Sequence, residues 1–132
     1  MGARLVTKDE LFTQADIVTV HLVLSDRTRG IVGEHELGLM RPTAYLVNTS
    51  RGPIVDEDAL IRAVDEDRIA GAGIDVYSVE PLPADHPYRS LKNTLLTPHI
   101  GYVSSDGYDF MYGDAVEDIK AFLAGAPVRQ VQ

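Results

Sequence analysis

The chain has 132 residues, the length of a single domain, and a composition of 45% hydrophobic and 24% charged residues that is ordinary for a globular protein. Its net charge of −8 weighs against nucleic acid and anionic membrane surfaces as partners, because both attract clustered positive charge. The absence of cysteine excludes disulfides, zinc–thiolate sites and cysteine nucleophiles. No apolar run approaches the ~18–20 residues that cross a bilayer, and the first residues lack a signal-peptide core, so we expect a cytoplasmic protein.

The N-terminal part predicts a strand, a helix and a second strand. Residues 4–7 form a short β-prone run. Lys8–Gln14 predicts a short helix, with Thr7 as its N-cap and Glu10 completing a capping box. Residues 16–24 are nearly all β-branched or apolar, which is typical of a strand buried on both faces.

The middle of the chain continues the alternation. Residues 34–40 predict a short helix that Pro42 ends, and residues 43–47 predict another buried strand. Residues 56–68 predict an amphipathic helix with acidic residues in its first turn. Residues 70–76 predict a strand of small residues.

The remaining residues predict a loop, a strand and a long helix. Prolines at 81, 83 and 87 indicate the loop, and residues 94–97 predict the last strand. Residues 105–124 predict a long amphipathic helix that Gly125 and Pro127 end. Its apolar stripe consists of Tyr108, Met111, Ala115, Ile119 and Phe122.

This order of elements predicts an α/β fold with a parallel sheet and right-handed crossovers. Ligands of such sheets bind beyond the carboxyl ends of the strands. Polar residues lie near or after the ends of four predicted strands, at His21, residues 48–52, Asp75 and residues 98–101. We therefore predict a single site built from these four stretches.

Arg51 and His99 of this site, and Glu80 five residues after Asp75, have side chains suited to acid–base chemistry on an anion. Arg51 could grip a carboxylate with both guanidinium nitrogens, or could be a loop arginine in an ion pair. His99 could transfer protons near neutral pH, or could be a turn histidine bonded to backbone. Glu80 could orient the His99 ring and stabilise its imidazolium, or could be a solvated loop acid.

Two further residues have open assignments. Asp75 at a strand's end could accept a hydrogen bond from an amide ligand, or could cap a turn. His21 lies inside an apolar run, which favours a core or cofactor-edge histidine over a base. We predict no metal site, because no histidine or carboxylate pair has ligand spacing in a credible pocket. The residues alone therefore predict a histidine, an arginine and a carboxylate on an α/β sheet, without a named reaction.

Four stretches together resemble the D-isomer-specific 2-hydroxyacid dehydrogenases. They are ADIVTVHLVLSDRTRGIVGEHELGLMRP, AYLVNTSRGPIVDEDALIRAV, RIAGAGIDVYSVEPLP and NTLLTPHIGY, in the family's order and spacing. The resemblance runs over essentially residues 3–132 and implies a partial Rossmann-like, doubly wound parallel sheet that lacks its first βα units. It also implies that the helix within residues 103–126 packs on a substrate domain or on another chain.

The resemblance implies hydride transfer between NAD(H) and C2 of a small 2-hydroxy or 2-keto acid. His99 would exchange the proton of the C2 oxygen, Glu80 would keep His99 protonated for reduction, and Arg51 would hold the substrate carboxylate. Asp75 would contact the nicotinamide carboxamide. The resemblance further implies a cofactor-binding set of His21, Leu22, Thr49, Ser50, Arg51, Asp75, His99 and Gly101.

The sequence also departs from the family. Many members have proline where this chain has Val23, and the glycine-rich phosphate loop of the family is absent. The loop that discriminates NAD from NADP follows the family's second strand, which is also missing, so the two cofactors are not distinguished. We expect the missing strands to leave an apolar sheet edge bare and to favour self-association as a dimer, through that edge or the C-terminal helix. We expect the isolated chain to be inactive without the missing part, and the alternative function is a non-catalytic fragment or interaction module of the same fold.

Overall fold

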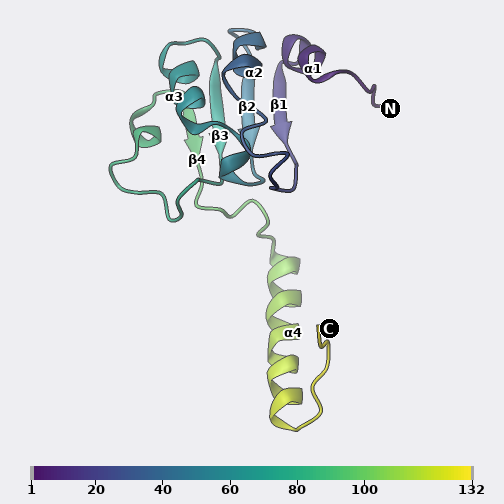
Figure 1. The fold of residues 1–132 in the computed structure, drawn as a ribbon. Coiled ribbons are helices and arrows are strands. Elements are labelled where there is room, and N and C mark those ends of the chain that lie inside the picture. Colours follow the sequence, from purple (N-terminus) through teal and green to yellow (C-terminus); the bar gives the residue numbers. More distant parts are fainter. Residues whose placement is uncertain (1, 132) are drawn as a thin grey trace. The chain divides into compact units, whose positions relative to one another are not determined.

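The computed structural model describes residues 2–131, which fall into two compact units. The first unit runs as far as Gly101 and contains a sheet, three α-helices and two short 3₁₀-helices (Figure 1). The second unit begins at Tyr102 and contains one long helix.

The first unit is built on a four-stranded sheet in the order β1-β2-β3-β4. Its strands are β1 (Ile17–Val20), β2 (Tyr45–Asn48), β3 (Gly71–Ile74) and β4 (Thr94–Leu96). Every neighbouring pair is parallel, and in Figure 1 all four arrows point the same way. The predicted α/β fold with a parallel sheet is confirmed.

The register brings the ends of the four strands into line. Val20 pairs with Asn48, Asn48 with Ile74, and Ile74 with Leu96. The residues that follow these four therefore start the loops at one edge of the sheet, as the strand-end rule requires for a shared site.

Three α-helices belong to this unit: α1 (Lys8–Gln14) precedes β1, α2 (Glu34–Leu39) connects β1 to β2, and α3 (Glu57–Asp65) connects β2 to β3. The capping box of α1 is present, because Thr7 and Glu10 each accept from the other's backbone N–H. The Asp56 side chain accepts from the Ala59 N–H and begins α3. The structure adds two 3₁₀-helices that the sequence did not predict, η1 (Gly52–Ile54) and η2 (Pro87–Ser90).

The core lies on one face of the sheet only. Val18 and Leu46 are buried in a cluster with residues of all three helices, including Phe12, Leu37 and Leu60. The prediction that residues 16–24 form a strand buried on both faces is wrong, because alternate side chains of β1 are exposed. The opposite face presents Ile17, Tyr45 and Leu95, with 63%, 50% and 71% of their surface exposed.

The strand predicted at residues 4–7 is also wrong. These residues are not assigned to any strand or helix in the described structure, and Leu5 is exposed. A short β-prone run becomes a strand only when a neighbour accepts and donates its backbone hydrogen bonds, and the described edges of the sheet do not pair with it.

The second unit consists mainly of α4 (Ser105–Leu123). The Ser104 side chain accepts from the Gly107 N–H at its start, and Gly125 follows its end with a φ of 73°. None of the side chains of α4 is buried, and the predicted stripe from Tyr108 to Phe122 is exposed. No helix within residues 2–131 combines the length and apolar character needed to span a membrane.

Candidate functional site

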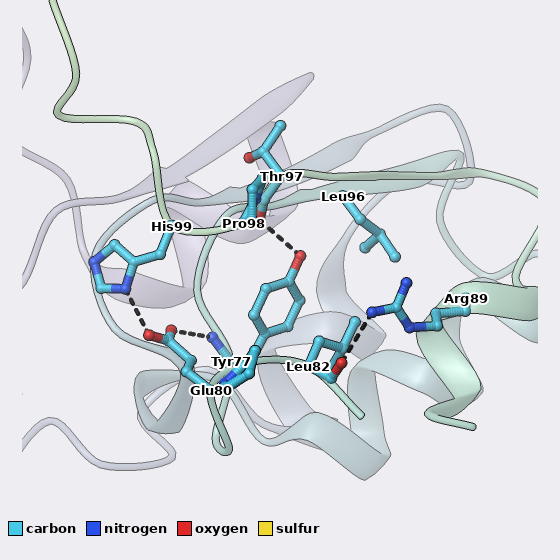
Figure 2. A pocket seen from close by; sticks show the side chains of 9 residues that line it. Tyr77, Glu80, Leu82, Arg89, Leu96, Thr97, Pro98 and His99 are labelled. Atoms are coloured by element: carbon cyan, nitrogen blue, oxygen red, sulfur yellow. Dashed lines mark hydrogen bonds and ion pairs between the residues drawn. The ribbon is translucent and has the colours of Figure 1, made fainter. Parts of the chain in front are cut away.

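His99 and Glu80 form a close pair beyond the ends of β3 and β4. His99 Nδ1 lies 2.7 Å from Glu80 Oε2, and about a third of each side chain is exposed to solvent (Figure 2). His99 has a φ of 57°, a left-handed conformation that is uncommon outside glycine. The structure therefore brings together the histidine and the carboxylate of the predicted site.

The surroundings of Glu80 favour its ionised form. Partial burial acts to raise the pKa of the Glu80 carboxyl, but the hydrogen bonds to His99 and to the Tyr77 backbone N–H outweigh it. The positive charges of His99 and Arg51 add to this effect, so the pKa of Glu80 lies below its ordinary value. A carboxylate beside the imidazole is the arrangement that stabilises an imidazolium.

Asp75 organises the segment that carries His99. Its Oδ1 accepts from the Thr97 hydroxyl and, at 2.9 Å, from the Ile100 N–H, and its Oδ2 accepts from the Gly101 N–H at 2.8 Å. Burial acts to raise the pKa of Asp75, but these three donors outweigh it, and the pKa is lowered. A carboxylate has about four lone-pair sites, so one remains for a further donor.

Arg51 is held at the end of β2 by a buried asparagine. The Asn48 side chain donates to the Arg51 carbonyl and accepts from the Ser50 N–H, both at 3.0 Å. This side chain closes residues 48–51 into a tight turn and leaves the exposed guanidinium beyond it. The Arg51 Nη1 donates to the Ser50 carbonyl at 2.6 Å.

Two hollows flank these residues. One, of about 440 Å³, lies between the loops after β1 and β2 and is lined by His21, Leu22, Val23, Leu24, Thr49, Ser50 and Arg51. The Ser50 hydroxyl donates to the Leu22 carbonyl and joins the two loops. The other, of about 460 Å³, lies beside the His99–Glu80 pair and is mainly apolar, with Arg89 at its wall (Figure 2).

Sequence reasoning missed two residues of the site. The backbone N–H of the buried Tyr77 donates to the Glu80 carboxylate, and its hydroxyl donates to the Thr97 carbonyl. The Thr97 hydroxyl donates to the Asp75 carboxylate. One signal was available for Tyr77, because a tyrosine buried next to a strand end needs a partner for its hydroxyl. The sequence carries no local signal for Thr97, since its partner Asp75 is distant along the chain.

The chain matches the family model described as "D-isomer specific 2-hydroxyacid dehydrogenase, NAD binding domain" over residues 1–101. The chain belongs to this family. It is 42% identical over 125 residues to a glyoxylate reductase from Aeropyrum pernix, a match that covers 95% of this chain and 37% of that protein.

Two solved structures of relatives have the same fold. A phosphoglycerate oxidoreductase from Vibrio cholerae o395 matches with a TM-score of 0.84 and 39% identity, over 92% of this chain and 39% of that one. A D-isomer specific 2-hydroxyacid dehydrogenase from Xanthobacter autotrophicus Py2, in complex with NADPH and MES, matches with a TM-score of 0.71 and 36% identity. This match covers 94% of this chain and 51% of that one. The Rossmann-like class is confirmed, and the chain spans about two fifths to one half of these relatives.

The hollow between the loops after β1 and β2 suits part of a dinucleotide. Its volume of about 440 Å³ falls in the range of roughly 300–1,000 Å³ that is usual for small-molecule sites. The apolar side chains of Leu22 and Val23 would cover a ring, and the hydroxyl of Thr49 and the guanidinium of Arg51 would meet its polar groups. These residues fit the nicotinamide half of NAD.

Proposed function

We propose that this chain carries the proton-transfer and substrate-anchoring residues of a dehydrogenase that moves a hydride between NAD(H) and C2 of a small 2-hydroxy or 2-keto acid. The observation that carries the proposal is the 2.7 Å contact of His99 Nδ1 with Glu80 Oε2 at the carboxyl edge of a parallel sheet. The charge of Arg51 acts on the same carboxylate, which supports a single site for all three side chains.

His99 is the proposed acid and base. With Nδ1 held by Glu80, its Nε2 would give a proton to the C2 oxygen during reduction and take it back during oxidation. Glu80 would stabilise the imidazolium that donates the proton in reduction and that forms again in oxidation. A positioned group of this kind contributes roughly 10²–10⁴-fold to a rate.

Arg51 is the proposed anchor of the substrate. Its guanidinium would hold the carboxylate at C1 with two parallel hydrogen bonds. Together with protonated His99 it would stabilise the negative charge that develops on the C2 oxygen. The turn closed by Asn48 sets the position of this guanidinium.

The proposed cofactor is NAD(H), which supplies the hydride when bound. The residues proposed to hold it are His21, Leu22, Thr49, Ser50, Arg51, Asp75, His99 and Gly101. NADPH is a second candidate, because one relative of known structure is described in complex with it. Glyoxylate is the first substrate to test, because a similar protein is named glyoxylate reductase. The cytoplasm is the proposed location.

We also propose that copies of this chain self-associate. The uncovered sheet face with Ile17, Tyr45 and Leu95 supports this, because apolar surface of this kind is normally removed from water. The exposed stripe of α4 supports it independently. The alternative function, a non-catalytic fragment or interaction module, would use the same surfaces without turnover.

The test is NADH oxidation by the 132-residue chain with glyoxylate, preceded by calorimetric titration with NADH. We expect His99→Ala to lower turnover by about 10²–10⁴-fold. His35→Ala is the matched control, because His35 is an exposed histidine on α2 whose ring pairs with Asp9. Absence of NADH binding and of turnover in the unsubstituted chain favours the non-catalytic alternative.

A further inference from the structure

We propose that Tyr77 is a positioning residue that sets the His99–Glu80 pair by joining the loops that carry Arg51, Glu80 and His99. Its consequence for catalysis rests on the proposed function, whereas the contacts that define it do not. Tyr77 is itself buried and lies three residues after the end of β3.

The first connection runs through the backbone of Tyr77. Its N–H donates to Glu80 Oε1 at 2.9 Å, while Oε2 of the same carboxylate contacts His99 Nδ1 at 2.7 Å. The two oxygens belong to one planar group, so a hydrogen bond to one of them restricts the directions open to the other. The Tyr77 amide thereby directs Glu80 at the His99 ring, and Figure 2 shows both contacts on one carboxylate.

The second connection runs through the hydroxyl of Tyr77. It lies 2.8 Å from the Thr97 carbonyl and 3.1 Å from the Ile74 carbonyl, which share its single proton. Ile74 ends β3, and Thr97 lies two residues before His99. Burial raises the pKa of Tyr77, and the charge of Asp75 adds to the rise, so the hydroxyl stays a donor.

The third connection is steric. A Cβ placed on Gly52, the residue after Arg51, would overlap the carbonyl group of Tyr77. The backbone of Tyr77 therefore lies directly against the turn that carries Arg51. Only a residue without a side chain fits at this contact.

A neighbouring tyrosine provides a matched control. The rings of Tyr77 and Tyr88 lie 6.4 Å apart in the same core, and both are buried. The hydroxyl of Tyr88 donates to none of the site residues within the described chain. Removing either hydroxyl takes one oxygen out of the same core, but only the Tyr77 hydroxyl contacts the carbonyls of Thr97 and Ile74.

The test follows the titration of the Glu80 side-chain carboxyl by carbon NMR in the labelled 132-residue chain. Tyr77→Phe keeps the ring and removes the hydroxyl. We expect the midpoint of the Glu80 titration to rise by about 0.5 pH unit, because the hydrogen bonds that lower this pKa loosen. Tyr88→Phe should leave the midpoint within about 0.1 pH unit of the unsubstituted chain.

A Glu80 midpoint that is unchanged in Tyr77→Phe overturns the inference, and so does an equal rise in Tyr88→Phe. The readout is independent of turnover, so an inactive chain with an altered Glu80 titration in Tyr77→Phe favours the non-catalytic alternative and leaves this inference standing.

A measurement on the unsubstituted chain covers the case in which Tyr77→Phe does not fold. The Tyr77 amide proton donates to Glu80, so its chemical shift should change with pH at the same midpoint as the Glu80 carboxyl carbon. An amide shift that stays flat through the Glu80 titration overturns the inference without any variant.

Discussion

Asp75 is a buried carboxylate whose two oxygens accept from three neighbouring donors. Only 3% of its surface is exposed, and its oxygens accept from Thr97, Ile100 and Gly101. These partners lie on both sides of His99, so the left-handed turn at His99 is held from its two ends. A strained backbone conformation of this kind persists where several surrounding contacts hold it in place.

Asp75→Asn tests this role. The amide nitrogen of asparagine would face an N–H donor, so we expect a loss of about 1–3 kcal/mol in the free energy of unfolding at pH 7. Urea denaturation measures the loss. Asp26→Asn, at an exposed aspartate, is the control and should change the stability by less than about 0.5 kcal/mol.

The pH dependence of the same variant follows from the lowered pKa of Asp75. A group whose pKa is lower in the folded state stabilises the fold above its unfolded value, and this stabilisation is lost as the pH falls through the folded value. The difference between the unsubstituted chain and Asp75→Asn should therefore be constant above about pH 4 and shrink below it. A difference that grew in acid would contradict this assignment.

The short helix η1 is positioned by a contact between two backbones. Gly52 begins η1, and the carbonyl of Tyr77, from the loop after β3, occupies the space where its Cβ would lie. This contact couples the end of β2 to the end of β3 independently of the sheet hydrogen bonds. It therefore sets how closely the Arg51 turn approaches Glu80.

Gly52→Ala should separate these two loops. A backbone cannot yield as the end of a flexible side chain can, so we expect a loss of at least about 2 kcal/mol in the free energy of unfolding. Gly38→Ala is the matched control within α2, where an added Cβ meets no atom within 4 Å. That control should stabilise the chain by up to about 1 kcal/mol, because alanine favours helix over glycine. Thermal unfolding of both variants makes the comparison.

The whole first unit has one covered and one uncovered sheet face. Helices α1, α2 and α3 contribute to the core on one side, while Ile17 on the other side is exposed over 63% of its surface. A lysine at this position would remain solvated in a monomer but would oppose burial against a second copy.

Ile17→Lys therefore tests the proposed self-association. We expect light scattering of the unsubstituted chain at micromolar concentration to give more than the monomer mass of 14.4 kDa, and the variant to return to that mass. Leu5→Lys, which alters an exposed leucine outside the sheet, should leave the association unchanged. A monomer in the unsubstituted chain would rule the association out.

Local signals in the sequence were sufficient for most elements. The capping box at Thr7 and Glu10 located α1 to the residue, and acidic residues before an apolar period located α3 closely. These signals work because capping and helical periodicity involve residues within one or two turns of each other. The parallel arrangement also followed, since strands joined through helices are normally parallel.

The burial of the strands could not be predicted from such local signals. Residues 16–24 are apolar on both faces, yet only one face is covered, and residues 4–7 are β-prone yet unpaired. Burial and pairing depend on which other elements lie alongside, and the apolar character of a segment does not determine its neighbours.

The strand-end rule predicts from the sequence that Arg51, Asp75 and His99 lie in one region, because the types and positions of these residues are properties of the chain. The contacts that give the region its chemistry come from the tertiary structure alone. Gly101 is held by Asp75 across 26 residues, and Thr97 by Tyr77 across 20. Such contacts arise only when the strands align, since a hydrogen bond requires its two atoms within about 3 Å and a sequence specifies order but not distance.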